Sequence, residues 1–289
     1  MNYQESLRGR SILLMISSAL FFSVMSAFVK MAGDLPSIEK ALFRNLISLI
    51  IAFTILKVRK QPLWGQKENR KILLLRALTG SLGILFYFYS IDHLILADSS
   101  MLNKMSPFFV ILFARIILKN PIKPFQIFSL ILAVAGSFLI IKPGFQYSTP
   151  LPALIGLSSA VFAGLAYTMV SYLGGKENAF TIVFYFSLIS TIVCLPFVFI
   201  NPVLPSLPQF LLLLGAGITA AGGQFLLTAA YKYAPAGEVS VYQYSQIVFA
   251  SLLGILFFTE IPDLFSLGGY ILIFAAGNMI SRKGIKSRK

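Results

Sequence analysis

The chain has 289 residues, of which 57% are hydrophobic and only 12% are charged. A soluble domain carries roughly 25% charged residues, because its surface faces water. The mean hydropathy of +0.83 therefore excludes an ordinary soluble protein and indicates that lipid surrounds most of the chain. One cysteine and one histidine exclude a disulfide framework and any metal site built from several thiolates or imidazoles. No cofactor is expected.

Ten apolar segments follow one another along the chain, each near the roughly 20 residues that a spanning helix needs. They predict an all-α integral membrane protein of ten transmembrane helices. The predicted spans are residues 11–32, 39–57, 72–93, 97–118, 125–142, 151–173, 178–200, 208–230, 236–259 and 264–281.

The net charge of +14 is explained by topology. Lys and Arg favour the cytoplasmic loops of membrane proteins, and with the N-terminus inside, most of the 24 basic residues fall in cytoplasmic segments. We therefore predict a multi-pass protein of the inner or plasma membrane with both termini cytoplasmic, including a basic tail at 284–289. The expected partners are the lipid bilayer and a small-molecule substrate. No soluble domain is left to bind nucleic acid, and the sequence leaves monomer and homodimer open.

An internal repeat divides the chain. Residues 17–21 (SSALF) recur as residues 158–162 (SSAVF), an offset of 141, and further identities keep nearly the same offset. The repeats are predicted as 1–145 and 150–283, with five spans each. Because five is odd, the second copy must lie inverted relative to the first, and its counterpart of the basic segment 57–71 carries no basic residue. Inverted repeats around a central cavity are the architecture of alternating-access transporters.

With these features the chain resembles the drug/metabolite transporter superfamily, in particular its ten-helix EamA branch. The resemblance rests on the two five-span repeats and on short motifs at span ends. These motifs are Glu39-x4-Arg44, Ser106-Pro107, Ile141-Lys142-Pro143-Gly144 and Glu260. The resemblance implies a basket of helices around a central cavity, spans 5 and 10 at its periphery, and transport of amino acids, related metabolites or drugs. Two departures are Asn120, where an acid usually ends span 4, and Gln246 or Ile247, where span 9 usually has proline.

Spans 4 and 9 carry polar groups at positions that the repeat makes equivalent. Asn103 and Ser106 are predicted on one face of span 4, and Gln243 and Gln246 on one face of span 9. Polar groups inside a membrane usually face protein or water. They are therefore candidates for contact with a polar substrate, or for hydrogen bonds that hold the repeats together.

The same region holds a cation. Lys104, equivalent to Tyr244 in the second repeat, lies several residues inside span 4 and would favour a substrate carboxylate or phosphate, or would pair with a backbone carbonyl or with Asp98. The complete set of candidate substrate-binding residues is Asn103, Lys104, Ser106, Tyr167, Gln224, Tyr242, Gln243, Tyr244 and Gln246.

Other charged residues have less direct roles. Arg44 is expected to pair with Glu39 or to reach the outer headgroups, and Lys30, Arg76 and Arg115 are expected to extend toward the membrane surface. Asp98 and Glu238 occupy equivalent first turns, where a helix N-terminus stabilises negative charge. Candidate charge or gating residues are Arg44, Asp98 and Glu238.

The sequence thus predicts a secondary transporter, not an enzyme, that exports or exchanges small polar metabolites such as amino acids. The alternatives are uptake of a nucleotide-like or other organic anion or zwitterion, such as S-adenosylmethionine, and multidrug efflux. All ten acids fall in loops or near span ends, which favours facilitated diffusion or exchange over proton coupling. Substrate identity, direction and coupling stay open.

Overall fold

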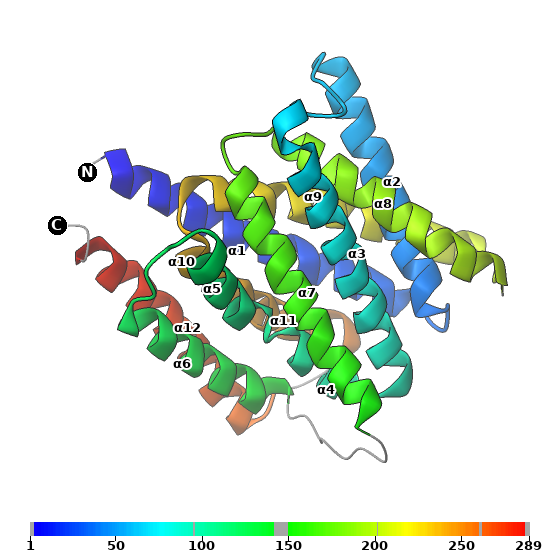
Figure 1. Ribbon diagram of the computed structural model, residues 1–289. Helices are drawn as coiled ribbons and strands as arrows, with labels where there is room; N and C mark the ends of the chain where they lie inside the picture. Colours follow the sequence, from blue (N-terminus) through cyan, green and yellow to red (C-terminus); the bar gives the residue numbers. More distant parts are fainter. Residues whose placement is uncertain (1–2, 95, 142–149, 201, 260–261, 287–289) are drawn as a thin grey trace.

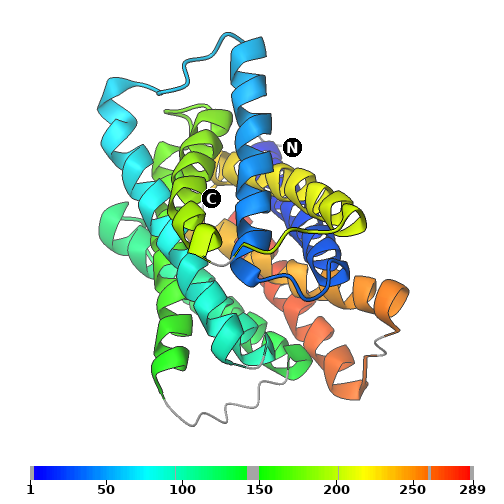
Figure 2. The same ribbon diagram turned by 90° about the vertical axis from the view of Figure 1, so that its right-hand side faces the viewer.

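The computed structural model describes residues 3–94, 96–141, 150–200, 202–259 and 262–286, without the side chains of 3–5, 91–92, 96–98, 281 and 284–286. The described chain is a bundle of helices (Figures 1 and 2). In chain order they are α1 (Tyr3–Met31), α2 (Ser37–Val58), η1 (Lys67–Asn69), α3 (Arg70–His93), α4 (Leu96–Asn103), α5 (Ser106–Ile117), α6 (Pro124–Ile141), α7 (Leu151–Leu173), α8 (Ala179–Ile200), α9 (Leu207–Tyr233), α10 (Ala236–Val239), η2 (Ser240–Tyr244), α11 (Ser245–Phe258) and α12 (Leu264–Lys286).

Hydrophobicity explains why these segments are helical. Inside a bilayer every backbone N–H and C=O must be paired within the protein, and a helix pairs them within one segment. Within the described residues, nine helical segments are long and apolar enough to cross a membrane, and Leu264–Ile280 is a shorter apolar helix. The chain is therefore a multi-pass membrane protein, and the tenth crossing stays a prediction.

Two of the predicted spans are interrupted. In the segment 97–118, α4 ends at Asn103 and α5 begins at Ser106, with Pro107 in its first turn. Proline lacks the N–H that a continuous helix needs at this point. In the segment 236–259, the 3₁₀ helix η2 stands between α10 and α11. The interruption thus occurs at the repeat-equivalent place in both segments, although only the first contains a proline there.

The long helices pack in pairs. α1 lies against α9, α3 against α7, α2 against α8 and α6 against α12. The last pair lies at one edge of the bundle (Figure 1). Each pair joins one helix from the first half of the chain to one from the second. The two halves therefore pack against each other along all four pairs.

Two glycines allow α6 and α12 to touch through their backbones. A Cβ atom on Gly136 would lie 2.6 Å from the carbonyl oxygen of Gly269, and one on Gly269 would lie 2.5 Å from that of Gly136. Contacts this short do not exist between real Cβ atoms and backbone. In membranes, such small residues let helices approach closely and gain packing energy.

Replacing Gly269 by Ala should therefore force α6 and α12 apart and lower the thermal unfolding midpoint of the detergent-purified protein. Gly268→Ala is the matched control, because its Cβ would meet only a side-chain atom of Leu139 at 3.9 Å. Both substitutions gain the same intrinsic helix propensity, about 1 kcal/mol. Equal midpoints for the two variants would contradict the close crossing.

Candidate functional site

The interrupted segments meet at Lys104. Its Nζ donates a hydrogen bond to Oε1 of Gln246 at 2.7 Å, and the hydroxyl of Tyr244 donates to its backbone carbonyl at 2.8 Å. The break between α4 and α5 leaves that carbonyl available, because the backbone N–H of Phe108, four residues further along, donates to the Met105 carbonyl instead. The side-chain ammonium and the backbone of Lys104 thus join the first half of the chain to the second.

The neighbouring amides also bond between helices. Nδ2 of Asn103 donates to Oγ of Ser159 in α7 at 3.0 Å, and Nε2 of Gln243 donates to the Tyr231 hydroxyl in α9 at 2.7 Å. The Tyr231 ring stacks on that of Tyr167, with 6.1 Å between centroids. These bonds match the interhelical role considered for the amides.

Partial exposure distinguishes some of these side chains from ordinary packing residues. The side chains of Asn103, Lys104, Tyr167, Gln243 and Gln246 are only partly buried. Polar groups that are bonded to each other but still accessible can exchange a protein partner for a ligand at modest cost.

The other candidates are more deeply placed. Tyr244 is fully buried, and Tyr242, 8% exposed, donates from its hydroxyl to the Gly277 carbonyl in α12 at 2.9 Å. Ser106 is 4% exposed. Gln224 in α9 is equally buried, and its Oε1 has no hydrogen-bond partner in the described part of the chain.

The expected charge pairs differ from those in the structure. Oε1 of Glu39 accepts a hydrogen bond from the Val203 backbone N–H at 2.6 Å, and among the described residues no ion pair joins Glu39 to Arg44. Asp98 lies outside the described side chains, and Glu260 and residues 142–144 lie outside the described residues.

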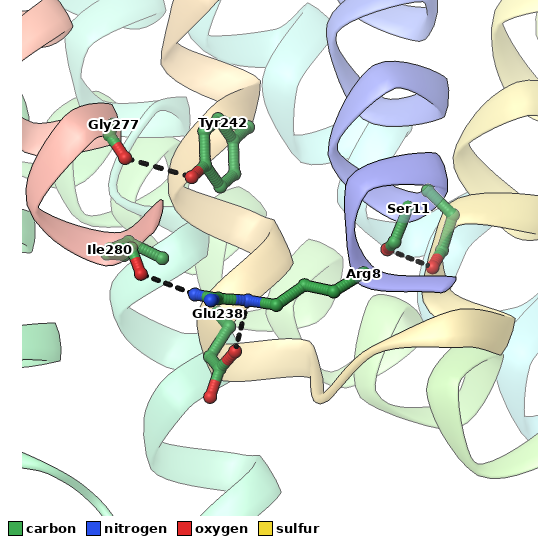
Figure 3. Close-up of polar contacts among 7 residues, drawn as sticks. Arg8, Ser11, Glu238, Tyr242, Gly277 and Ile280 are labelled. Atoms are coloured by element: carbon green, nitrogen blue, oxygen red, sulfur yellow. Dashed lines mark hydrogen bonds and ion pairs between the residues drawn. The ribbon is translucent and has the colours of Figure 1, made fainter. Parts of the chain in front are cut away.

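Glu238 forms an ion pair that the sequence analysis did not anticipate. Its Oε2 lies 3.1 Å from Nε of Arg8 in α1, and both side chains are more than nine-tenths buried. Arg8 also donates to the Ile280 carbonyl, so that one side chain connects α1, α10 and α12 (Figure 3). Ser11, one turn further along α1, donates to the Ala230 carbonyl of α9 at 2.7 Å.

The expectation for Arg76 is wrong. Its side chain is 1% exposed and its guanidinium carbon lies 4.0 Å from the centre of the Phe186 ring, so it does not extend to the membrane surface. The reason is packing: α3 lies against α8, and the guanidinium fits between the Phe186 ring and Gly80, where a Cβ atom would lie 2.4 Å from Nη1 of Arg76. Lys30 and Arg115, by contrast, are exposed.

A separate surface pocket of about 420 Å³ lies where α2 ends and α3 begins. Its lining includes Lys57, Lys60, Trp64 and Arg70. None of the predicted substrate-binding residues contributes to it.

A multi-pass helical bundle with a polar cluster at interrupted helices is an arrangement found in membrane transporters. The sequence model of the EamA-like transporter family matches residues 9–142 and again residues 151–282. The chain belongs to this family, within the drug/metabolite transporter superfamily.

Two of the similar proteins are an exporter and a solute carrier. The chain is 37% identical to the pseudopaline exporter CntI of Pseudomonas aeruginosa, over 94% of this chain and 95% of that protein. It is 28% identical to human solute carrier family 35 member G1, over 93% of this chain and 78% of that one. A crystal structure that is 15% identical in sequence superposes with a TM-score of 0.85 over 96% of this chain and 99% of the other, which supports the fold.

Proposed function

We propose that this protein exports or exchanges small polar metabolites that carry a carboxylate, such as amino acids and related compounds, across the inner or plasma membrane. The observation that carries the proposal is the partly exposed cluster at Lys104, which places one cation and several amides at the junction of two interrupted helices. Substrate sites of secondary transporters are built at such interruptions. The similarity to an exporter supports the direction.

Alternating access is the proposed mechanism. The family match to both halves of the chain and the cross-half helix pairs support two inverted repeats, in a ten-helix fold with both termini cytoplasmic. In this state the Arg8–Glu238 ion pair and the bond between Tyr242 and Gly277 tie together the helices at the end that bears the termini. Opening of this end would require these contacts to separate, and Glu238 is then a gating residue.

The test is transport by purified protein in liposomes preloaded with labelled amino acids, with and without a proton gradient. Saturable efflux that is independent of the gradient supports uncoupled export or exchange. Efflux no faster than from protein-free liposomes would contradict the amino-acid proposal.

Gln243→Leu should reduce efflux by about tenfold, because it removes an amide and leaves the Tyr231 hydroxyl without its donor. Asn278→Leu is the control, since Asn278 is an exposed amide in α12. Equal loss in both variants would indicate general damage to the bundle and would count against a substrate role for Gln243.

A further inference from the structure

The pocket between α2 and α3 is cationic, and the proposed transport mechanism does not use it. The segment 57–71 carries six basic residues and one acidic residue. Three of the basic residues, Lys57, Lys60 and Arg70, line the pocket of about 420 Å³, and all three are exposed. Within the part of the chain that the structure describes, none of them forms an ion pair with a carboxylate. The volume falls in the range of about 300–1,000 Å³ that is common for ligand pockets.

The rest of the lining is largely apolar. Leu56, Pro62, Leu63 and Trp64 contribute to it, and Trp64 is 53% exposed. A small inorganic anion has no apolar part to place against such residues, whereas a phospholipid carries its phosphate beside a glycerol and two acyl chains. Cations next to exposed apolar side chains therefore fit an anionic amphiphile, which would remove this apolar surface from water.

The pocket also lies at the level expected for the bilayer surface. Leu56 belongs to the last turn of the apolar span Ser37–Val58, and the chain leaves the bundle there (top of Figure 2). Nζ of Lys57 lies 5.6 Å from the centre of the Phe53 ring, an exposed ring of the same span, so this cation is at the surface of the bundle. Tryptophan is enriched at membrane interfaces, and Lys and Arg on their cytoplasmic side.

The end of α2 brings two of the cations to the same pocket. Lys60 has a φ of 51°, its N–H donates to the Lys57 carbonyl at 3.1 Å, and the N–H of Gln61 donates to the Leu56 carbonyl at 2.9 Å. These two bonds and the left-handed residue form a Schellman ending, which stops the helix and turns the chain. Lys57 and Lys60 consequently line one pocket from either side of the turn.

Contacts with α8 fix the rest of the loop. The Trp64 carbonyl accepts hydrogen bonds from the Tyr185 hydroxyl at 3.1 Å and from Nε of Arg70 at 3.2 Å. Oε1 of Glu177, just before α8, accepts two further bonds from the loop and η1, at 2.8 and 2.9 Å. The one carboxylate held against the loop is thus bonded to the protein itself. A lining fixed in this way costs little ordering entropy when a ligand binds.

We propose that this pocket binds the headgroup phosphate of an anionic phospholipid, such as phosphatidylglycerol, on the predicted cytoplasmic side of the membrane. Lys57, Lys60 and Arg70 surround the phosphate, and the glycerol and acyl chains lie against Leu63 and Trp64. Basic pockets at the cytoplasmic surface of membrane proteins bind phosphate headgroups in this way. Three cations favour a lipid of net negative charge, because they repel the choline of a zwitterionic one. The site is separate from the Lys104 cluster and does not depend on the proposed function.

Trp64 is the one tryptophan of the chain, so its fluorescence reports on this pocket. The protein is reconstituted in vesicles of phosphatidylcholine that contain an increasing mole fraction of a lipid whose acyl chains carry bromine close to the glycerol. Bromine quenches tryptophan fluorescence on contact. Brominated phosphatidylglycerol should reach half-maximal quenching at a mole fraction about tenfold lower than brominated phosphatidylcholine.

Lys57→Gln combined with Lys60→Asn should abolish this preference, and Asn tolerates the left-handed backbone at residue 60. The matched control is Lys67→Gln with Lys71→Gln, which removes two exposed cations of the same segment that do not line the pocket and should retain the preference. Lys57→Gln alone changes one exposed side chain and should reduce the preference about threefold, which gives a milder variant should the double one not fold.

Equal quenching by the two lipids in the wild type would overturn the site. A preference that survives in the variant of Lys57 and Lys60, or that falls equally in the control, would overturn it as well, since a general attraction of anionic lipid to basic loops would then suffice. Inorganic phosphate at constant ionic strength distinguishes the source of the phosphate. It should leave the quenching by brominated phosphatidylglycerol unchanged, and relief of the quenching would indicate a site for soluble anions in place of the lipid.

Discussion

Lys104→Met should reduce substrate efflux by about 100-fold or more, the effect expected when one partner of a desolvated charge pair is removed. Met preserves most of the volume of the side chain but removes the ammonium that bonds Gln246. The measurement is initial efflux from liposomes over a range of substrate concentrations, so that a change in KM is separated from a change in maximal rate.

The fold should survive this substitution. Tyr244 donates to the backbone carbonyl of residue 104, which is present whatever the side chain is. The lost bond from the charged ammonium is worth about 1.5–3 kcal/mol, but the substitution also removes the cost of holding a cation inside the membrane. The Gln246 amide is only partly buried and can be hydrated. The thermal unfolding midpoint should therefore change little.

Lys30→Met is the matched control, because Lys30 is an exposed lysine in a span, with its ammonium over the Phe258 ring. Lys104→Arg keeps the charge and should retain part of the efflux. Wild-type kinetics in Lys104→Met would exclude the ammonium from substrate binding and leave it a purely structural donor.

The sequence was sufficient for the membrane class and the approximate spans because hydrophobic length alone determines both. It also located Lys104 and Gln243 as intramembrane polar groups, since such residues are rare in apolar segments. Their partners could not be predicted, because Ser159 and Tyr231 are brought to them by packing between distant helices. Tyr231 even lies just beyond the predicted span, while α9 continues to Tyr233.

Hydropathy also could not predict how deeply an arginine side chain is buried in the bundle. Arg76 resembles a residue near a span end in the sequence, and only the packing of α3 against α8 shows that its side chain is buried over the Phe186 ring. Gly80 is the sequence feature that fits this burial, because a glycine one turn after an arginine leaves room for the arginine side chain to lie against the helix.

The Arg8–Glu238 pair should be the contact on which stability depends most. Removing one partner of a buried ion pair leaves an uncompensated charge and costs about 3–5 kcal/mol, whereas replacing both by apolar residues is often close to neutral. Glu238→Met and Arg8→Met should therefore each lower the free energy of unfolding strongly, and the double variant should recover most of the loss. Lys232→Met, an exposed cation near the end of α9, controls for the change in net charge.

A gating role of Glu238 can be tested separately from its contribution to stability. Ser11 is completely buried where α1 meets α9, and Cys194 is the one cysteine of the chain. Ser11→Cys in a Cys194→Ala background therefore supplies a single thiol that reagents can reach only when α1 and α9 separate. If the ion pair keeps this end closed, Glu238→Met should increase the labelling rate of that thiol under conditions where the protein stays folded. A purely structural pair would change the unfolding free energy while leaving the labelling rate as in the Ser11→Cys parent, because the folded population would still be closed.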